Sequence, residues 1–222
     1  SLHVRPIPRI GGIALMLGAF GVYEMLDRQP LRSIEFPVLL LIAVSFADDV
    51  WNLPALWRFL AHFAAAMIFT YWGLGFSPVD IVAILIVIAM VWMINLYNFM
   101  DGSDGLAGGM ALIGFFAYGA AASLAHHADL AVVSLSIAFS AAAFLLFNFH
   151  PAKVFLGDVG SIPLGFAAGS IGLLGWNRSI WPLWFPLLVF SPFIVDATLT
   201  LLKRLLCGER VWEGHREHYY QR

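Results

Sequence analysis

The sequence predicts an all-α fold, a polytopic transmembrane helical bundle, from its composition and from the spacing of its apolar stretches. Hydrophobic residues make up 61% of the 222 residues and charged residues only 12%, whereas a soluble domain carries about 25% charged residues. The mean hydropathy is +0.84. A membrane-spanning helix needs roughly 20 mainly apolar residues, and eight stretches approach that length. They lie near residues 10–26, 34–47, 58–73, 79–94, 106–124, 130–149, 161–176 and 181–202.

Polar segments separate these apolar stretches along the chain. The second stretch is short and ends at Asp48-Asp49, so we expect it to stop below the headgroup level or to continue into water as a polar helix. The fourth begins beside Asp80, a residue type that often precedes a helix. The acidic segments of the chain fall where an apolar helix should leave the membrane.

Alternation through eight spans places the acidic segments on one face of the membrane. This face carries the N-terminal segment and the loops around 48–57, 95–105, 148–160 and 203–222. Most of the lysines and arginines lie on it, namely Arg5, Arg9, Arg58, Lys153, Lys203, Arg204, Arg210, Arg216 and Arg222. Only Arg28, Arg32 and Arg178 lie on the opposite face. The positive-inside rule then predicts that the acidic face is cytoplasmic.

No change in composition divides the chain, so we expect residues 1–222 to form a single integral membrane domain. Cys207 is the only cysteine, which excludes an internal disulfide. A net charge of -2 gives no basic footprint for a nucleic-acid partner. Because residue 1 is Ser rather than Met, we expect a chain that has been trimmed or processed at its start.

Five carboxylates lie on the predicted cytoplasmic face: Asp48, Asp49, Asp101, Asp104 and Asp158. Neighbouring like charges raise each other's cost of ionisation unless a cation is present. Mg²⁺ takes oxygen ligands, usually one or two carboxylates together with substrate phosphates and water, so this set favours Mg²⁺, or Mn²⁺, over Zn²⁺. The alternative, that they are helix caps and solvated charges, explains a single aspartate better than all five together.

Two of these loops combine acids with groups suited to phosphate. Asn98, Asp101 and Asp104 are three residues apart, which in a helical turn would align them on one face. Lys153 and Asp158 place a cation and a candidate metal ligand in one loop, an arrangement suited to a diphosphate. The alternative for Lys153 is that it extends along the membrane interface toward water.

Two further polar features lie near the C-terminal end. His215 and His218 flank Arg216, and imidazole and guanidinium groups suit a phosphate or a nucleotide. A basic tail that holds anionic lipid headgroups is the alternative. Asp196 lies within the eighth stretch, where an acid is costly, and either has a structural partner or lines the site.

Several segments of the sequence match the motifs of a known protein family: Pro8-Arg-Ile-Gly11-Gly12, Asp48-Asp49, the run 95–106, the run from Asn148 to Ser161 and the histidine segment 215–218. In this order they resemble the polyprenyl-phosphate N-acetylhexosamine-1-phosphate transferases, glycosyltransferase family 4. Members of this family begin peptidoglycan, enterobacterial common antigen and O-antigen lipid intermediates. The resemblance covers nearly the whole chain.

The resemblance implies a role for each matched residue. Asp158 would be a Mg²⁺ ligand, and Asp48 and Asp49 would contact the metal or activate the lipid phosphate. The predicted nucleotide and diphosphate site consists of Asn98, Asp101, Asp104, Asn148, His215 and His218. The implied reaction is attack by the phosphate of a polyprenyl phosphate on the β-phosphorus of a UDP-sugar, with release of UMP.

The chain departs from the family pattern at two places. Asn52 replaces a lysine often found three residues after the acidic pair, and the last motif reads His-Arg-Glu-His rather than consecutive histidines. The second departure favours simple amino sugars, as in the initiation of O-antigen for lipopolysaccharide, over a muramoyl-pentapeptide substrate. Family members have about ten or eleven spans, so eight implies a fragment that lacks at least the first helix. A homodimer is expected from the resemblance only.

Three other classes of protein share part of these features. An intramembrane aspartyl protease would need Gly-x-Gly-Asp, but Phe155 stands at the first glycine position. A CDP-alcohol phosphotransferase would need Ala-Arg where Gly108-Gly109 stand. A divalent-cation transporter is the leading alternative, and it should place its acids near the bilayer midplane.

Overall fold

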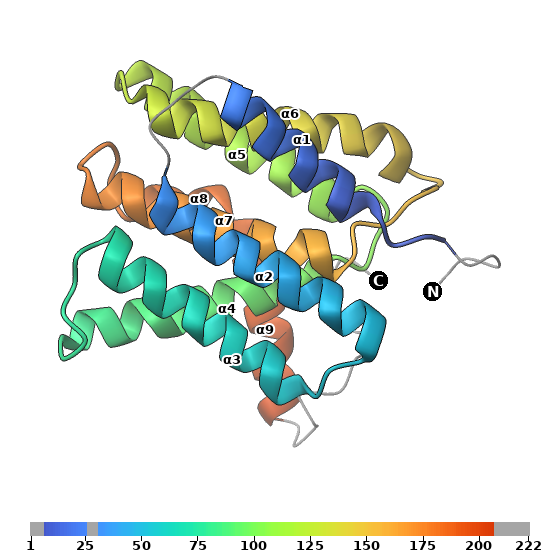
Figure 1. The fold of residues 1–222 in the computed structure, drawn as a ribbon, viewed down its shortest axis with the longest axis horizontal. Coiled ribbons are helices and arrows are strands. Elements are labelled where there is room, and N and C mark those ends of the chain that lie inside the picture. The colour runs from blue at the N-terminus through green and yellow to red at the C-terminus, as the bar shows by residue number, and fades with distance from the viewer. Residues whose placement is uncertain (1–6, 26–30, 207–222) are drawn as a thin grey trace.

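The computed structural model describes residues 7–25 and 31–206, and this part of the chain is helical with no strand (Figure 1). The helices are α1 (Gly11–Met25), α2 (Arg32–Trp51), α3 (Ala55–Ile68), the π-helical turn η1 (Phe69–Gly73), α4 (Ile81–Met100), α5 (Leu106–Leu124), α6 (Ala128–Asn148), α7 (Asp158–Asn177), α8 (Trp184–Val189) and α9 (Ser191–Leu206). The prediction of an all-helical fold is therefore confirmed.

Four of the described helices, α4 to α7, are long and apolar enough to cross a membrane. The structure also exposes many large apolar side chains on these helices, such as Leu85 and Ile88 on α4 and Ile113 on α5. Contiguous apolar surface of this kind is rare on a soluble monomer. The chain is thus a multi-pass membrane protein, although eight full spans are not seen in the described residues.

The predicted stretches differ from the helices mainly at their ends. The second stretch continues to Trp51, so that the predicted polar extension of this helix carries Asp48 and Asp49 in its last turn. The helix α2 stops at Asn52, which adopts a left-handed conformation with φ 49°. The fourth stretch continues beyond residue 94 to Met100, so that Asn98 lies in the last turn of α4.

The eighth predicted stretch, 181–202, is wrong as a single helix, because the chain breaks at Phe190 between α8 and α9. Pro192 stands in the first turn of α9, where its missing N–H is not needed. Phe190 and Phe193 pack on the buried ring of Tyr97, with a distance of 5.1 Å between the ring centroids of Tyr97 and Phe193. Packing on α4 thus fixes where α9 begins.

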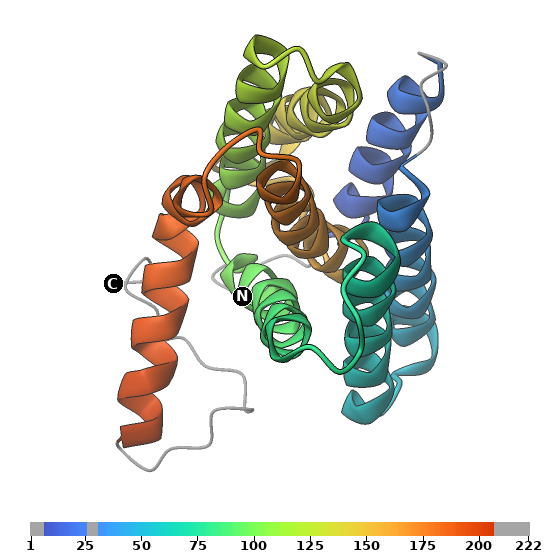
Figure 2. The ribbon, with the colours of Figure 1, turned by 90° about the vertical axis from the view of Figure 1, so that its left-hand side faces the viewer.

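Helix α7 lies at the centre of the bundle, and α9 stands at its edge (Figure 2). Most of the α7 residues are buried, and α7 packs on α1, α2, α4, α5, α6 and α8. Small residues make this possible: a Cβ atom at Gly165 would lie 2.9 Å from the Cα atom of Ile94 on α4. The N-terminal end of α7 therefore has a position fixed by most of the bundle.

The segment before α7 pairs with the start of α1. Phe155 N–H donates to Pro8 O at 2.9 Å, Gly11 N–H donates to Phe155 O at 3.0 Å, and Gly12 N–H donates to Leu156 O at 2.8 Å. A Cβ atom at Gly12 would lie 2.5 Å from the Cα atom of Gly160. The Gly-Gly pair is thus required because two backbones touch here.

Candidate active site

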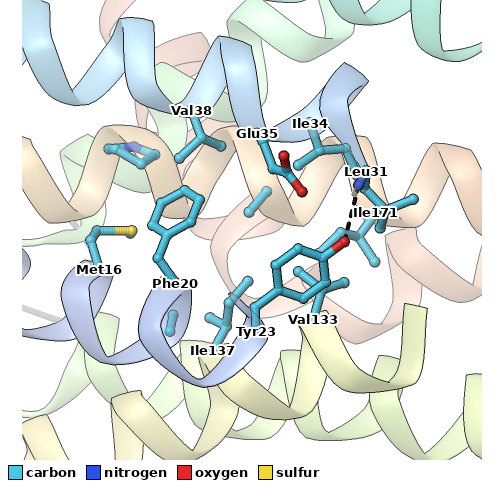
Figure 3. A pocket seen from close by; sticks show the side chains of 13 residues that line it. Met16, Phe20, Tyr23, Leu31, Ile34, Glu35, Val38, Val133, Ile137 and Ile171 are labelled. Carbon is cyan, nitrogen blue, oxygen red and sulfur yellow. Dashed lines mark hydrogen bonds between the residues drawn. The ribbon is translucent and has the colours of Figure 1, made fainter. Parts of the chain in front are cut away.

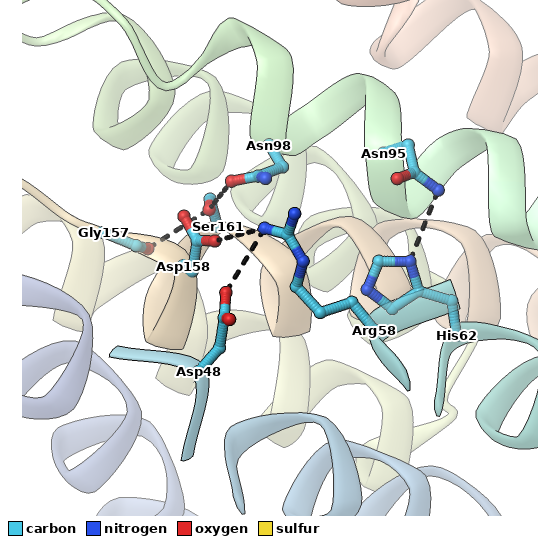
Figure 4. A network of polar contacts seen from close by, with 8 residues as sticks. All are labelled: Asp48, Arg58, His62, Asn95, Asn98, Gly157, Asp158 and Ser161. Carbon is cyan, nitrogen blue, oxygen red and sulfur yellow. Dashed lines mark hydrogen bonds and ion pairs between the residues drawn. The ribbon is translucent and has the colours of Figure 1, made fainter. Parts of the chain in front are cut away.

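Acidic side chains from three helices meet at one end of the bundle. Asp48 and Asp49 end α2, Asp101 directly follows α4, and Asp158 is the first residue of α7. The guanidinium of Arg58, in the first turn of α3, joins two of them (Figure 4). Its Nη1 donates to Oδ2 of Asp48 at 3.2 Å and lies 3.8 Å from Oδ2 of Asp158.

The N-terminal end of α7 is held by contacts to α4 and to the residues before α1. Gly157 has φ +73°, and a Cβ atom there would lie 2.8 Å from the carbonyl oxygen of Arg9, so a larger residue is excluded. The N–H of Gly157 donates to Oδ2 of Asp101 at 3.1 Å. The hydroxyl of Ser161 donates to Oδ1 of Asn98 at 2.6 Å. These bonds fix the metal-ligand candidate at the start of α7 relative to α4.

The electrostatics of the cluster favour a cation. The pKa of Asp101 is raised to about 7, mainly by burial and also by the charge of Asp158, while the hydrogen bond from the N–H of Gly157 and the charge of Arg9 oppose the shift. Asp49 lies beyond the predicted span; burial and the neighbouring charge of Asp48 raise its pKa, and Arg9 again opposes the shift. Full ionisation of these carboxylates is therefore unfavourable in the protein alone.

The donor set suits a hard divalent ion that also binds substrate. Within residues 7–25 and 31–206, no three His, Cys, Asp or Glu side chains converge closely enough to hold a metal by themselves. Mg²⁺ does not need such a cage, since it commonly uses one or two carboxylates and takes its remaining ligands from substrate phosphates and water. Asp158, with 28% of its side chain exposed, fits that requirement.

The segment after α4 is a turn, so the predicted helical alignment of Asn98, Asp101 and Asp104 is wrong. Glycine-rich residues 101–105 end α4, and Gly105 has φ +74°. Asp104 contacts the loop that follows α6: its Oδ2 accepts a hydrogen bond from the N–H of Ala152 at 3.0 Å and lies 3.0 Å from Nδ1 of His150. Asp104 thus holds the loop that follows α6.

Asn148 is a buried bridge between the same two segments. Its side-chain oxygen accepts a hydrogen bond from Gly105 N–H at 2.9 Å, and its Nδ2 donates to Val154 O at 2.9 Å. Only 2% of the residue is exposed, so the structure gives it a supporting role. Lys153, in contrast, is exposed. Contact of either residue with substrate stays a prediction.

The predicted residues His215, Arg216 and His218 lie outside the described residues. Two arginines that the sequence assigned only to the charge balance, Arg9 and Arg58, face the acidic cluster instead. Arg58 could have been noticed, because it stands at the start of an apolar helix on the acidic face.

Polar contacts continue from the cluster along α3 and α4 (Figure 4). The buried ring of His62, one turn beyond Arg58, has its Nδ1 3.4 Å from Nδ2 of Asn95. The same Nδ2 donates to Val91 O at 2.7 Å. These contacts give the buried His62 a structural role between α3 and α4.

Two apolar cavities lie along the bundle, and neither is lined by the clustered acids Asp48, Asp49, Asp101 and Asp158. The larger, of about 400 Å³, lies between α4, α7, α8 and α9 and is lined by residues such as Met90, Met93, Trp176 and Ile194. The smaller, of about 40 Å³, lies between α1, α2, α6 and α7, where Glu35 and Tyr23 point into it (Figure 3). Only the larger has the size of a ligand pocket, which is roughly 300–1,000 Å³.

Comparison with known proteins identifies the family of this helical membrane bundle with acids at one end. Residues 31–175 match the model of glycosyl transferase family 4, and the chain belongs to this family. The family predicted from the motifs is thus confirmed.

Three relatives that are named as transferases are similar to this chain over most or all of its length. A probable undecaprenyl-phosphate N-acetylglucosaminyl 1-phosphate transferase from Bacillus subtilis is 27% identical over 242 residues, which cover 100% of this chain and 67% of the relative. A decaprenyl-phosphate N-acetylglucosaminephosphotransferase from Mycobacterium tuberculosis is 30% identical over 269 residues, covering 100% and 66%. A phospho-N-acetylmuramoyl-pentapeptide-transferase from Listeria monocytogenes is 32% identical over 238 residues, covering 94% and 72%.

The chain spans about two thirds of the length of the first two relatives. All three relatives are named as transferases, which gives no support to the transporter alternative. The described acids also argue against it, because Asp48, Asp101 and Asp158 lie at helix ends rather than near a bilayer midplane.

Proposed function

We propose that this protein transfers an N-acetylhexosamine-1-phosphate from a UDP-sugar to a polyprenyl phosphate such as undecaprenyl phosphate. The observation that carries the proposal is the meeting of carboxylates from α2, α4 and α7 at one end of a membrane bundle, beside Arg58. Phosphoryl transfer depends mainly on positioning and charge neutralisation, and this end of the bundle offers both. The names of the family relatives support the same reaction.

Asp158 would hold Mg²⁺, or Mn²⁺, with the diphosphate of the donor completing the coordination. A bound divalent ion would neutralise charge that develops on the phosphoryl group and the leaving UMP. The position of Asp158 supports this role, because it stands in the first turn of a fixed helix and keeps part of its carboxylate exposed. Asp49 is close enough to Asp158 for their charges to interact.

The remaining residues would position the two substrates. An oxygen of the lipid phosphate attacks the β-phosphorus, the bond from that phosphorus to the bridging oxygen breaks, and UMP leaves with the bridging oxygen. A phosphate monoester has a second pKa near 6, so little help from a base is needed at neutral pH. Asp48 and Asp49 would orient or deprotonate the lipid phosphate, and exposed Lys153 would bind the diphosphate of the donor.

The nucleotide would lie against the turn after α4 and the loop before α7. Asn98, Asp101, Asp104 and Asn148 build these two segments through their hydrogen bonds. His215, Arg216 and His218 complete this proposed site from outside the described residues.

The larger cavity offers a place for the polyprenyl chain. Its lining is almost entirely apolar, and it opens along α4 and α7, the helices whose ends carry Asp101 and Asp158. A lipid whose phosphate reaches the acids could therefore lay its tail beside α4 without leaving apolar surroundings.

We further infer the setting of the reaction. The excess of Lys and Arg on the acidic face supports a site that faces the cytoplasm from a bacterial inner membrane. The His-Arg-Glu-His motif supports a simple amino sugar, as in the initiation of O-antigen or another envelope glycan. A homodimer remains a prediction from family resemblance.

Release of UMP tests the proposal directly. Purified protein would be given a panel of UDP-N-acetylhexosamines with and without undecaprenyl phosphate and Mg²⁺, and release should require both. Asp158→Asn should abolish turnover while the protein stays folded. Asp129→Asn, which breaks an ion pair with Arg178 outside the acidic cluster, is the matched control and should retain turnover. Near-normal activity of Asp158→Asn at saturating Mg²⁺ would contradict the metal role.

A further inference from the structure

Arg58 occupies the space between two carboxylates that belong to different helices. Its Nη1 is 3.2 Å from Asp48 on α2 and 3.8 Å from Asp158 on α7. The two contacts are unequal, since the guanidinium donates a hydrogen bond to Asp48 but makes only an ion pair with Asp158. The link to Asp158 is therefore the weaker and the more easily broken.

The surroundings of Arg58 allow its guanidinium to move. Its side chain is 38% exposed, compared with 13% for Asp48 and 28% for Asp158. It extends from the first turn of α3, directly after the connection 52–54 between α2 and α3. The guanidinium can thus leave Asp158 while the more buried Asp48 continues to hold it.

We propose that Arg58 is a resident counter-ion that competes with the divalent metal for Asp158 and leaves Asp158, while keeping Asp48, when the metal binds. The inference rests on the metal site proposed above and adds a residue that sets its affinity. Arg58 neutralises part of the carboxylate charge when no metal is bound. Since Asp48 stays paired with Arg58, the neighbouring acids Asp48 and Asp49 have different surroundings.

Competition by Arg58 and a purely structural role predict opposite changes in metal affinity when Arg58 is replaced. A charge of +1 about 6 Å from a charge of +2 weakens binding of the ion by about tenfold even at the dielectric constant of water. Removing the charge of Arg58 should therefore tighten metal binding. If Arg58 only held α3 against the acids, its removal would loosen Asp158 and weaken metal binding instead.

The direction of this change is tested by measuring the binding of Mn²⁺ alone to the full chain, purified in detergent. Free Mn²⁺ is followed by electron paramagnetic resonance, with no substrate present. Arg58→Gln should lower the Kd for Mn²⁺ by about tenfold, and Arg58→Lys, which keeps the charge, should stay within about threefold of the parent protein. Arg178→Gln, which breaks another Arg–Asp pair, is the matched control and should leave the Kd unchanged.

A second measurement uses the unsubstituted protein, so it does not depend on the variant folding. Phenylglyoxal modifies accessible arginines, and mass spectrometry of the peptides reports each one separately. Saturating Mn²⁺ should speed the modification of Arg58 severalfold and leave that of Arg178 unchanged. Unchanged or slower modification of Arg58 would overturn the proposal.

The outcomes separate this inference from the proposed function. If the parent protein binds Mn²⁺ and releases UMP but Arg58→Gln binds Mn²⁺ equally or more weakly, the competition by Arg58 is wrong and the transferase stands. If the parent protein binds no Mn²⁺ and releases no UMP, the metal site and the competition both fall.

Discussion

The contact between Gly12 and Gly160 makes a sharp prediction about how α1 supports the site. A Cβ atom added by Gly12→Ala would lie 2.5 Å from the Cα atom of Gly160 and 2.7 Å from the carbonyl oxygen of Leu156. Both are backbone atoms, which cannot turn aside as a flexible side chain can. Since ordinary contact begins near 3.4 Å, α1 and the start of α7 must separate by about 1 Å.

The expected cost of this separation is about 3 kcal/mol, the upper end of the usual overpacking range. The melting temperature should fall by roughly 6–12 °C, on the scale of soluble domains of this size. Asp158 is the neighbour of the displaced residues, so turnover should fall together with stability. Thermal unfolding of the purified protein in detergent and release of UMP measure the two effects.

Gly21→Ala is the control on the same helix. No atom lies within 4 Å of the position of its Cβ atom, and alanine favours a helix over glycine by about 1 kcal/mol. This variant should be as stable as the parent protein or slightly more stable. Equal melting temperatures for Gly12→Ala and Gly21→Ala would refute the close packing of α1 on α7.

Two further predictions follow from the site. Asp101 has its pKa raised from 3.8 to about 7, so the folded protein binds this proton more tightly than the unfolded chain, and its contribution to stability is lost as the pH rises through about 7. In metal-free buffer, Asp101→Asn should therefore reduce the loss of melting temperature between pH 5 and pH 8, and an unchanged slope would contradict the assignment. Asn148→Asp keeps the acceptor for Gly105 but removes the donor to Val154 O, which should cost about 2–3 kcal/mol; a melting temperature equal to that of the parent protein would show that the bridge is unimportant.

The order of the motifs could be predicted from the sequence, but the contacts within them could not. Asp101 and Asp104 look equivalent in the string Asp-Gly-Ser-Asp-Gly, yet Asp101 accepts from the N–H of Gly157 and Asp104 accepts from the N–H of Ala152. The spacing suggested one helical face, and the glycines instead ended the helix. Which acid faces α7 depends on the path of a turn.

The helix break at Phe190 and the position of Arg58 could not be predicted from the sequence, because both depend on tertiary contacts. A run of apolar residues does not distinguish one helix from two, because its composition is equal in both cases. The packing of Phe193 on Tyr97 decides it. Likewise, the ion pair of Arg58 with Asp158 joins positions far apart in the chain.

The sequence alone determined that this protein is a helical membrane protein of glycosyl transferase family 4, with an ordered set of acids between its helices. The helices and the positions of the acids could be predicted because apolar length and polar interruption are local properties of the chain, whereas the family followed from the resemblance of the ordered motifs. The tertiary structure alone decided which acids meet, which of them hold loops and where Arg58 lies, because these contacts depend on the packing of α2, α3 and α4 around the buried helix α7.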